Sequence, residues 1–90
     1  MTTAELKKQT ESLSLIDIRE AYEFDTIHIP NSTNIPMDQA AENPTSLPTN
    51  ALLICQSGRR ANSLQFILKT RHNREDLQVL EGGVNDYFQL

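Results

Sequence analysis

The chain carries one cysteine, Cys55, at the end of a continuous apolar run that has the length of a strand. A short polar stretch with one glycine and two arginines follows, and a helical pattern comes after it. A strand, a tight loop and a helix N-terminus together direct backbone N–H groups at one point, which suits an anion. A cysteine at that point favours the thiolate, the nucleophilic form of the side chain. The pattern therefore predicts a covalent catalyst centred on Cys55.

A lone cysteine after an apolar strand is more often an inert core residue than a nucleophile. The polar loop that follows Cys55, with Gly58, Arg59 and Arg60 in a row, favours the reactive interpretation. Because the chain has a single thiol, an internal disulfide and a zinc site of several thiolates are excluded. We expect neither a metal nor a cofactor in the chemistry.

Composition and charge limit the partners of this catalyst. The 90 residues carry a net charge of −4, and the only tight basic cluster is Arg59–Arg60, beside the cysteine. Nucleic-acid binding needs a broad basic face, so a small anionic substrate is expected instead. No apolar run is long enough to cross a bilayer, and the first residues lack the order of a secretion signal. The sequence therefore predicts a cytoplasmic protein with no nucleic-acid or membrane partner.

Strand-like and helix-like segments alternate along the chain. Such alternation favours a parallel sheet whose neighbouring strands are joined by right-handed helical crossovers. Ligands of these sheets bind at the carboxyl ends of the strands, and Cys55 directly follows a predicted strand. Strands are expected at 13–18, 27–29, 33–35, 51–54 and 77–80, and helices at 2–11, 20–24, 37–42, 59–70 and 84–90.

Three separated motifs resemble the signatures of single-domain rhodaneses, a family of sulfurtransferases. They are Leu15–Glu20 with Phe24–Pro36, the loop Cys55–Ala61, and Leu80–Tyr87. Their order and spacing along the chain resemble those of the family. The resemblance implies an α/β fold with residues 1–90 as one domain. This would be a small three-layer domain in which a mainly parallel central sheet of four to five strands is flanked by helices.

The chain departs from the family pattern at three positions. The family usually has glycine where this chain has Ile27 and Asn31, and commonly tryptophan where it has Tyr87. Asparagine tolerates a left-handed turn that a β-branched residue resists. We therefore expect the loop near Ile27 to be reshaped.

The resemblance also implies a two-step covalent reaction at Cys55. The thiolate attacks the outer sulfur of thiosulfate or another sulfane donor, and cyanide or a thiol then takes the sulfur from the persulfide. Four residues separate Cys55 from Arg60. In related folds that act on phosphate or arsenate esters, one more residue lies between the cysteine and the arginine. The narrower loop therefore favours sulfur over an oxyanion. The residues expected to bind the substrate are Gln56, Ser57, Gly58, Arg59, Arg60 and Ala61.

The loop residues have different expected roles. The backbone N–H groups of segment 56–61 hold the persulfide, and their side chains matter less. Gly58 permits the turn of the backbone, and Arg60 helps to fold the loop or neutralises charge. Arg59 faces solvent, where it can meet an anionic donor.

Several polar and aromatic residues outside the loop are expected to be structural. Asp17 and Arg19 follow a buried strand and, as the resemblance suggests, pair locally or cap the next helix. His28 is expected to be a hydrogen-bonded structural residue rather than a base. We expect Phe66 and Phe88 in the core, Tyr22 half-buried and His72 in solvent.

Three functions compete at this point. The leading hypothesis is a thiosulfate or persulfide sulfurtransferase that works through a Cys55 persulfide. A second is a protein-to-protein persulfide carrier, whose donor or acceptor is another protein. A third is a non-catalytic regulatory module, which the presence of Cys55 disfavours. Phosphatase or arsenate reductase activity ranks last because the loop is one residue too short.

Overall fold

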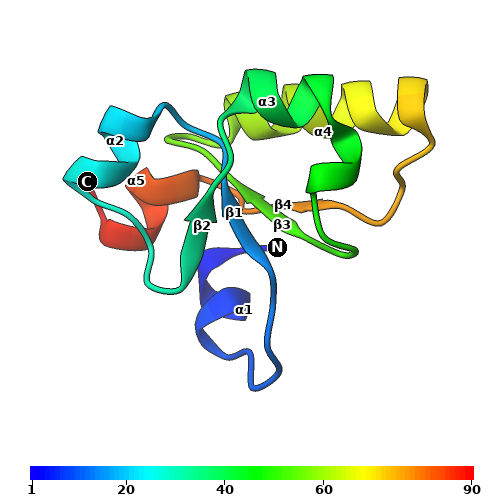
Figure 1. Cartoon of the computed structure of the whole chain (residues 1–90). Helices are drawn as coiled ribbons and strands as arrows, with labels where there is room; N and C mark the ends of the chain where they lie inside the picture. Colours follow the sequence, from blue (N-terminus) through cyan, green and yellow to red (C-terminus); the bar gives the residue numbers. More distant parts are fainter.

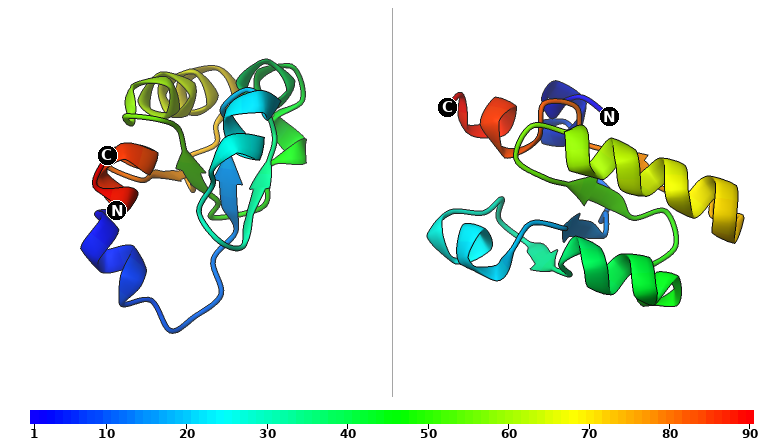
Figure 2. Two further views of the ribbon diagram at one scale, coloured as in Figure 1. Left: turned by 90° about the vertical axis from the view of Figure 1, so that its left-hand side faces the viewer. Right: turned by 90° about the horizontal axis from the view of Figure 1, so that it is seen from above.

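Four short strands form a parallel sheet with helices on both faces in the computed structural model, which describes residues 1–90 (Figures 1 and 2). The strand order is β2-β1-β3-β4, and every neighbouring pair is parallel. The strands are β1 (Leu15–Asp17), β2 (Ser32–Asn34), β3 (Leu52–Ile54) and β4 (Gln78–Val79). The helices are α1 (Thr3–Lys7), α2 (Ala21–Thr26), α3 (Met37–Glu42), α4 (Arg59–His72) and α5 (Gly83–Phe88), with a 3-10 turn at Pro44–Ser46.

The register of the sheet brings the carboxyl ends of three strands to one edge. Asp17, the last residue of β1, lies beside Asn34 of β2 and Ile54 of β3. Cys55 follows Ile54 directly and therefore stands at this edge. Parallel sheets bind their ligands at this end because the loops that leave the strands gather there.

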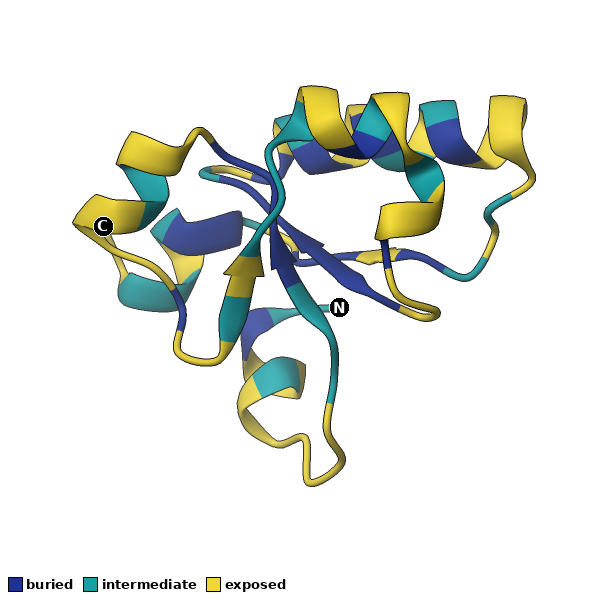
Figure 3. Ribbon diagram, viewed as in Figure 1, coloured by how far each residue is buried: buried dark blue, intermediate teal, exposed yellow.

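One apolar layer lies between the sheet and the helices α3 and α4. Ile16 and Leu53 contribute from the strands, and Leu64 and Leu68 contribute from α4, where a spacing of four residues places both on one face. Cys55 belongs to the same layer, since residues 53 and 55 point to the same side of an extended chain. Figure 3 shows the buried residues gathered along β1 and β3 and the inner side of α4, whereas β2 has none.

A second apolar layer covers the opposite face of the sheet. Leu52 and Ile54 point into it and pack with Ile29, Leu80 and Val84. Partly buried side chains of α1 and α5 close this layer from outside. The domain therefore has three layers around a parallel sheet, as the sequence predicts, and the sheet has four strands.

Segment 27–29 is not the strand that the sequence predicts. Ile27 ends α2 in an extended conformation with φ of −158°, and it is 38% exposed. Only Ile29 of this segment is buried, and Pro30 and Asn31 then turn the chain into β2. Asn31 has φ of 70°, the left-handed conformation that asparagine tolerates. At position 27 the backbone is extended, so this position does not require glycine.

Two predicted aromatic positions are also wrong. Phe66 is 66% exposed because it lies on the side of α4 opposite to Leu64 and Leu68, at about 100° of rotation per residue. Tyr22 is 72% exposed rather than half-buried, since α2 has no buried residue at all. The first helix also ends at Lys7, well before its predicted end near Glu11.

Candidate active site

The sulfur of Cys55 lies at the base of a loop that connects β3 to α4. Its Sγ accepts hydrogen bonds from the backbone N–H of Gly58 at 3.0 Å and of Ala61 at 3.4 Å. Gly58 has φ of 99° and immediately precedes α4, which begins at Arg59. A side chain resists this backbone conformation, so glycine allows the chain to turn the two N–H groups onto the sulfur. The arrangement suits a sulfur atom that carries negative charge.

The other side of the loop is fixed by the start of α5. The N–H of Val84 donates to the carbonyl of Cys55 at 2.9 Å, and the N–H of Asn85 donates to the carbonyl of Gln56 at 3.0 Å. Gly83 has φ of 56° and lies directly against these two carbonyl groups. The two glycines of segment 82–83 therefore form a turn that packs against the backbone of Cys55 and Gln56 and supports the loop.

The side chain of Gln56 links the loop to two further parts of the molecule. Its amide oxygen accepts a hydrogen bond from Arg19 Nη1 at 2.9 Å, and its amide nitrogen donates to Asn85 Oδ1 at 2.6 Å. Gln56 thus connects α5 with the segment that follows β1. The side chain of Gln56 therefore positions the loop. This differs from the expectation that the side chains of segment 56–61 matter less than their backbone N–H groups.

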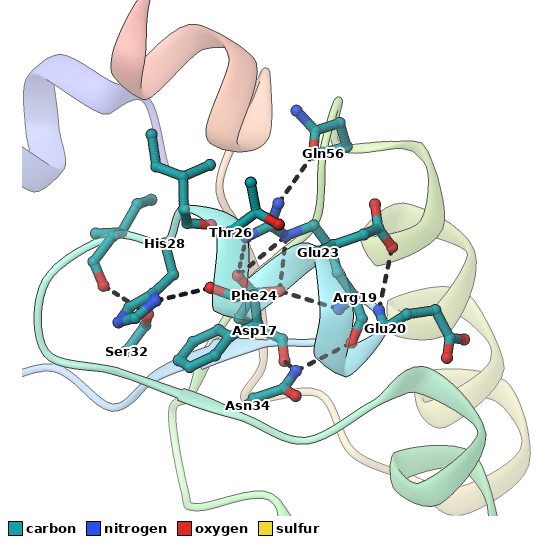
Figure 4. Close-up of polar contacts among 12 residues, drawn as sticks. Asp17, Arg19, Glu20, Glu23, Phe24, Thr26, His28, Ser32, Asn34 and Gln56 are labelled. Atoms are coloured by element: carbon teal, nitrogen blue, oxygen red, sulfur yellow. Dashed lines mark hydrogen bonds and ion pairs between the residues drawn. The ribbon is translucent and has the colours of Figure 1, made fainter.

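Arg19 and Asp17 form a buried ion pair at the end of β1. Both are at most 1% exposed, and the guanidinium binds both carboxylate oxygens at 2.8 to 3.1 Å. Arg19 Nη2 also donates to the carbonyl of Ile27 at 2.6 Å, and Asn34 Nδ2 donates to the carbonyls of Asp17 and Arg19 (Figure 4). The pair therefore ties β1, β2, the end of α2 and Gln56 together.

Arg60 extends from the first turn of α4 to Glu23 on α2. Its two Nη atoms donate to the two carboxylate oxygens of Glu23 at 2.9 and 3.0 Å. The hydrogen bonds from Arg60 hold the pKa of Glu23 below its ordinary value, and Glu23 in turn raises the pKa of Arg60. This ion pair holds α2 beside the cysteine loop.

The two remaining polar side chains of the loop face solvent. Arg59 and Ser57 are exposed, and neither side chain makes a hydrogen bond or ion pair. His28 lies outside the loop, where Nδ1 is 2.8 Å from the carbonyl of Phe24 and the ring stacks on that of Phe24 at 3.8 Å. This hydrogen bond agrees with the structural role predicted for His28.

The chain offers no group of three or more histidine, cysteine, aspartate or glutamate side chains arranged to hold a metal ion. None of its helices has the length and apolar character needed to span a bilayer.

Sequence reasoning missed three residues that shape the loop, namely Glu23, Gly83 and Asn85. Each acts on residues far away in the chain: Glu23 pairs with Arg60, and Asn85 bonds to Gln56. Local periodicity carries no signal of such contacts. For Gly83, the adjacent pair of glycines signalled a turn but not its position under Cys55.

The comparison with known proteins is decisive for the family. Residues 2–90 match the rhodanese-like domain. The chain belongs to the rhodanese-like family. A rhodanese-related protein from Thermoplasma volcanium superposes with a TM-score of 0.85 at 24% identity, covering 99% of this chain and 89% of that one. At this identity the likeness shows the fold alone.

Two curated relatives of this rhodanese-like chain have names that refer to sulfur. It is 31% identical over 74 residues to a putative sulfur carrier protein of Bacillus subtilis, covering 80% of this chain and 40% of that protein. It is 27% identical over 95 residues to the thiosulfate:glutathione sulfurtransferase of Saccharomyces cerevisiae, covering 89% and 68% respectively. The chain thus spans less than half of the Bacillus relative.

Proposed function

We propose that this chain is a sulfurtransferase that carries a sulfane sulfur as a persulfide on Cys55. It takes the sulfur from thiosulfate or a persulfide donor and passes it to cyanide or a thiol. The observation that carries the proposal is the pair of backbone N–H groups, from Gly58 and Ala61, directed at the cysteine sulfur at 3.0 and 3.4 Å. Membership of the rhodanese-like family supports the same chemistry.

The loop accounts for each step of this reaction. The Cys55 thiolate attacks the outer sulfur of the donor, the sulfur–sulfur bond of the donor breaks, and its electron pair leaves with sulfite or a thiolate. The new terminal sulfur carries negative charge, which the N–H groups at the start of α4 stabilise. The acceptor then attacks this terminal sulfur and restores the Cys55 thiolate. No metal or organic cofactor takes part in these steps.

Cys55 is 1% exposed, which favours donors that present a narrow terminal sulfur. Arg59, exposed at the start of α4, is the residue we assign to the anionic part of the donor. A reducing compartment such as the cytoplasm suits the reaction, because it keeps thiol acceptors in their reduced form.

Steady-state turnover tests the proposal. With thiosulfate and cyanide, the wild type should release thiocyanate, and Cys55→Ser should release none while remaining folded. Thiocyanate release at the wild-type rate by Cys55→Ser would reject the role of this cysteine.

A second candidate function is a protein-to-protein persulfide carrier. The similarity to a putative sulfur carrier favours it. The exposure of Tyr22 on α2 and of Ile27 directly after α2 also favours it, because Arg60 holds this helix beside the loop. Exposed apolar side chains next to a reactive group suit a protein partner. Faster loading from a protein-bound persulfide than from thiosulfate would support the carrier, and equal rates with all donors would reject it.

A further inference from the structure

Three arginines lie in or against the cysteine loop, and carboxylates already hold two of them. Arg19 is bound by Asp17 in a fully buried pair. Arg60 is bound by Glu23 through two parallel hydrogen bonds. Arg59 is exposed and makes no ion pair. The loop therefore presents one uncompensated positive side chain to an incoming donor.

This balance of charge matters because sulfane donors differ in charge. Thiosulfate is a dianion, so the single positive charge of Arg59 neutralises only half of the charge on this donor. A thiosulfonate is a monoanion, and an alkyl persulfide carries at most one negative charge. Recruiting Arg60 to thiosulfate would require the donor to compete with a bidentate carboxylate, the strongest geometry for such a pair.

We propose that Glu23 sets the donor preference of this site, by holding Arg60 and so disfavouring thiosulfate relative to singly charged or neutral sulfane donors. This inference rests on the proposed function and narrows its donor class to sulfane donors that carry at most one negative charge. Glu23 is a positioning residue, since it acts through Arg60.

The contacts of Glu23 indicate which substitution tests its effect on Arg60. The side chain of Arg60 is 39% exposed, and the residue lies in the first turn of α4, directly after the loop that holds Cys55. Glu23 also accepts a hydrogen bond from the N–H of Glu20 at 3.1 Å (Figure 4). Glutamine at position 23 retains an oxygen for that bond, removes the charge and replaces the second oxygen that Arg60 binds with an NH2 donor, so its hold on Arg60 is weakened.

Both donor reactions balance without any further reagent. With thiosulfate, the Cys55 thiolate forms a bond to the outer sulfur, the sulfur–sulfur bond breaks, and sulfite leaves with the electron pair. With an alkyl persulfide, the same attack on the outer sulfur releases the alkyl thiolate, and the proton of the persulfide stays on the transferred sulfur or passes to solvent. Cys55 ends as a persulfide in both cases.

The test compares single-turnover loading of Cys55 by thiosulfate and by methanethiosulfonate, which transfer the same sulfur but carry two charges and one charge. Glu23→Gln should raise the ratio of the thiosulfate rate to the methanethiosulfonate rate about fivefold, as expected for one partly exposed charge. Asp25→Asn is the matched control, because it removes the same charge from the exposed side of α2 without touching Arg60. It should leave the ratio within about twofold of the wild type.

Repeating the Glu23→Gln substitution in an Arg60→Gln variant shows whether Glu23 changes the rate ratio through Arg60. In Arg60→Gln, the further change Glu23→Gln should no longer raise the ratio. Glu23→Ala should raise the ratio of the thiosulfate rate to the methanethiosulfonate rate as Glu23→Gln does. Agreement between the two variants would show that the effect comes from loss of the carboxylate and not from the particular side chain introduced. An unchanged ratio in both Glu23 variants, with Cys55 still loaded, would overturn the inference and leave the proposed function intact. Failure of both donors to load Cys55 in the wild type would overturn both.

Discussion

Gly83 lies against the backbone of Cys55 so closely that a side chain has no room there. A Cβ atom on Gly83 would stand 2.2 Å from the carbonyl oxygen of Cys55 and 2.8 Å from that of Gln56. Both contacts are with backbone, so no side-chain movement relieves them. The start of α5 therefore fixes the position of the cysteine loop, and the C-terminal part of the chain contacts the candidate site through its backbone.

Gly83→Ala should destabilise the domain and displace the loop. The left-handed φ of 56° costs a side chain about 1–2 kcal/mol, and the clash adds to this, so we expect a total loss above about 2 kcal/mol. Urea unfolding measures the loss, and single-turnover loading of Cys55 should slow. Gly58→Ala is the comparison, because its Cβ would come no nearer than 3.4 Å to another atom. Equal stability losses in the two variants would contradict this account.

Asp17→Asn should be among the most damaging single changes in this chain. It leaves the guanidinium of Arg19, which is 1% exposed, without its countercharge. Loss of one partner of a buried ion pair costs about 3–5 kcal/mol. The free energy of unfolding in urea measures this, with the exposed Asp25→Asn as a control that should change it by less than about 0.5 kcal/mol. A loss below 1 kcal/mol in Asp17→Asn would show that the pair is not needed for folding.

Gln56→Ala should slow sulfur loading and weaken the fold modestly. It removes the hydrogen bonds to Arg19 and Asn85 and leaves one N–H of Arg19 unpaired. Each bond contributes about 1 kcal/mol, so we expect a stability loss of about 1–3 kcal/mol. Asn62→Ala, on the exposed side of α4, is the control and should leave the loading rate unchanged. An unaltered loading rate in Gln56→Ala would remove its side chain from the positioning machinery.

Acid should destabilise the domain through two paired carboxylates. Hydrogen bonds from Arg60 lower the pKa of Glu23 from an ordinary value of 4.5, and those from Arg74 lower the pKa of Asp76 from 3.8. A carboxylate with a lowered pKa in the folded state stabilises the fold above its ordinary pKa, and this stabilisation disappears as the pH falls through the lowered value. The free energy of unfolding should therefore decrease as the pH drops below 4.5.

The double variant Glu23→Gln, Asp76→Asn tests the origin of that acid sensitivity. Its stability should depend less on pH than that of the wild type when both are unfolded in urea at a series of acidic values. The same pH dependence in both proteins would assign the effect to other groups.

Much of the site could be predicted because its signal is local. The apolar run before Cys55 and the periodic apolar residues of α4 each reflect burial within a few neighbouring positions. Their order then placed the thiol at the carboxyl edge of a parallel sheet, where the structure has it. Pairing of Asp17 with Arg19 was also within reach, since only one residue separates them.

The errors arise where position depends on distant parts of the chain. Tyr22 is exposed because α2 is held by the Glu23–Arg60 pair and by Arg19, rather than by apolar packing. Segment 27–29 looked like a strand from its β-branched residues, but Pro30 and Asn31 turn the chain and leave it unpaired. The first fact cannot be read from a window of a few residues, whereas the second has a local signal in the adjacent Pro30 and Asn31.

The mass of the intact protein after exposure to a sulfane donor tests the central claim most directly. After incubation with thiosulfate or methanethiosulfonate and removal of the excess, the wild type should gain one sulfur atom, located by peptide mapping at Cys55. Cyanide should remove that atom, and Cys55→Ser should gain none. An unmodified wild type with both donors, or the same gain in Cys55→Ser, would contradict the assignment of Cys55 as a persulfide carrier.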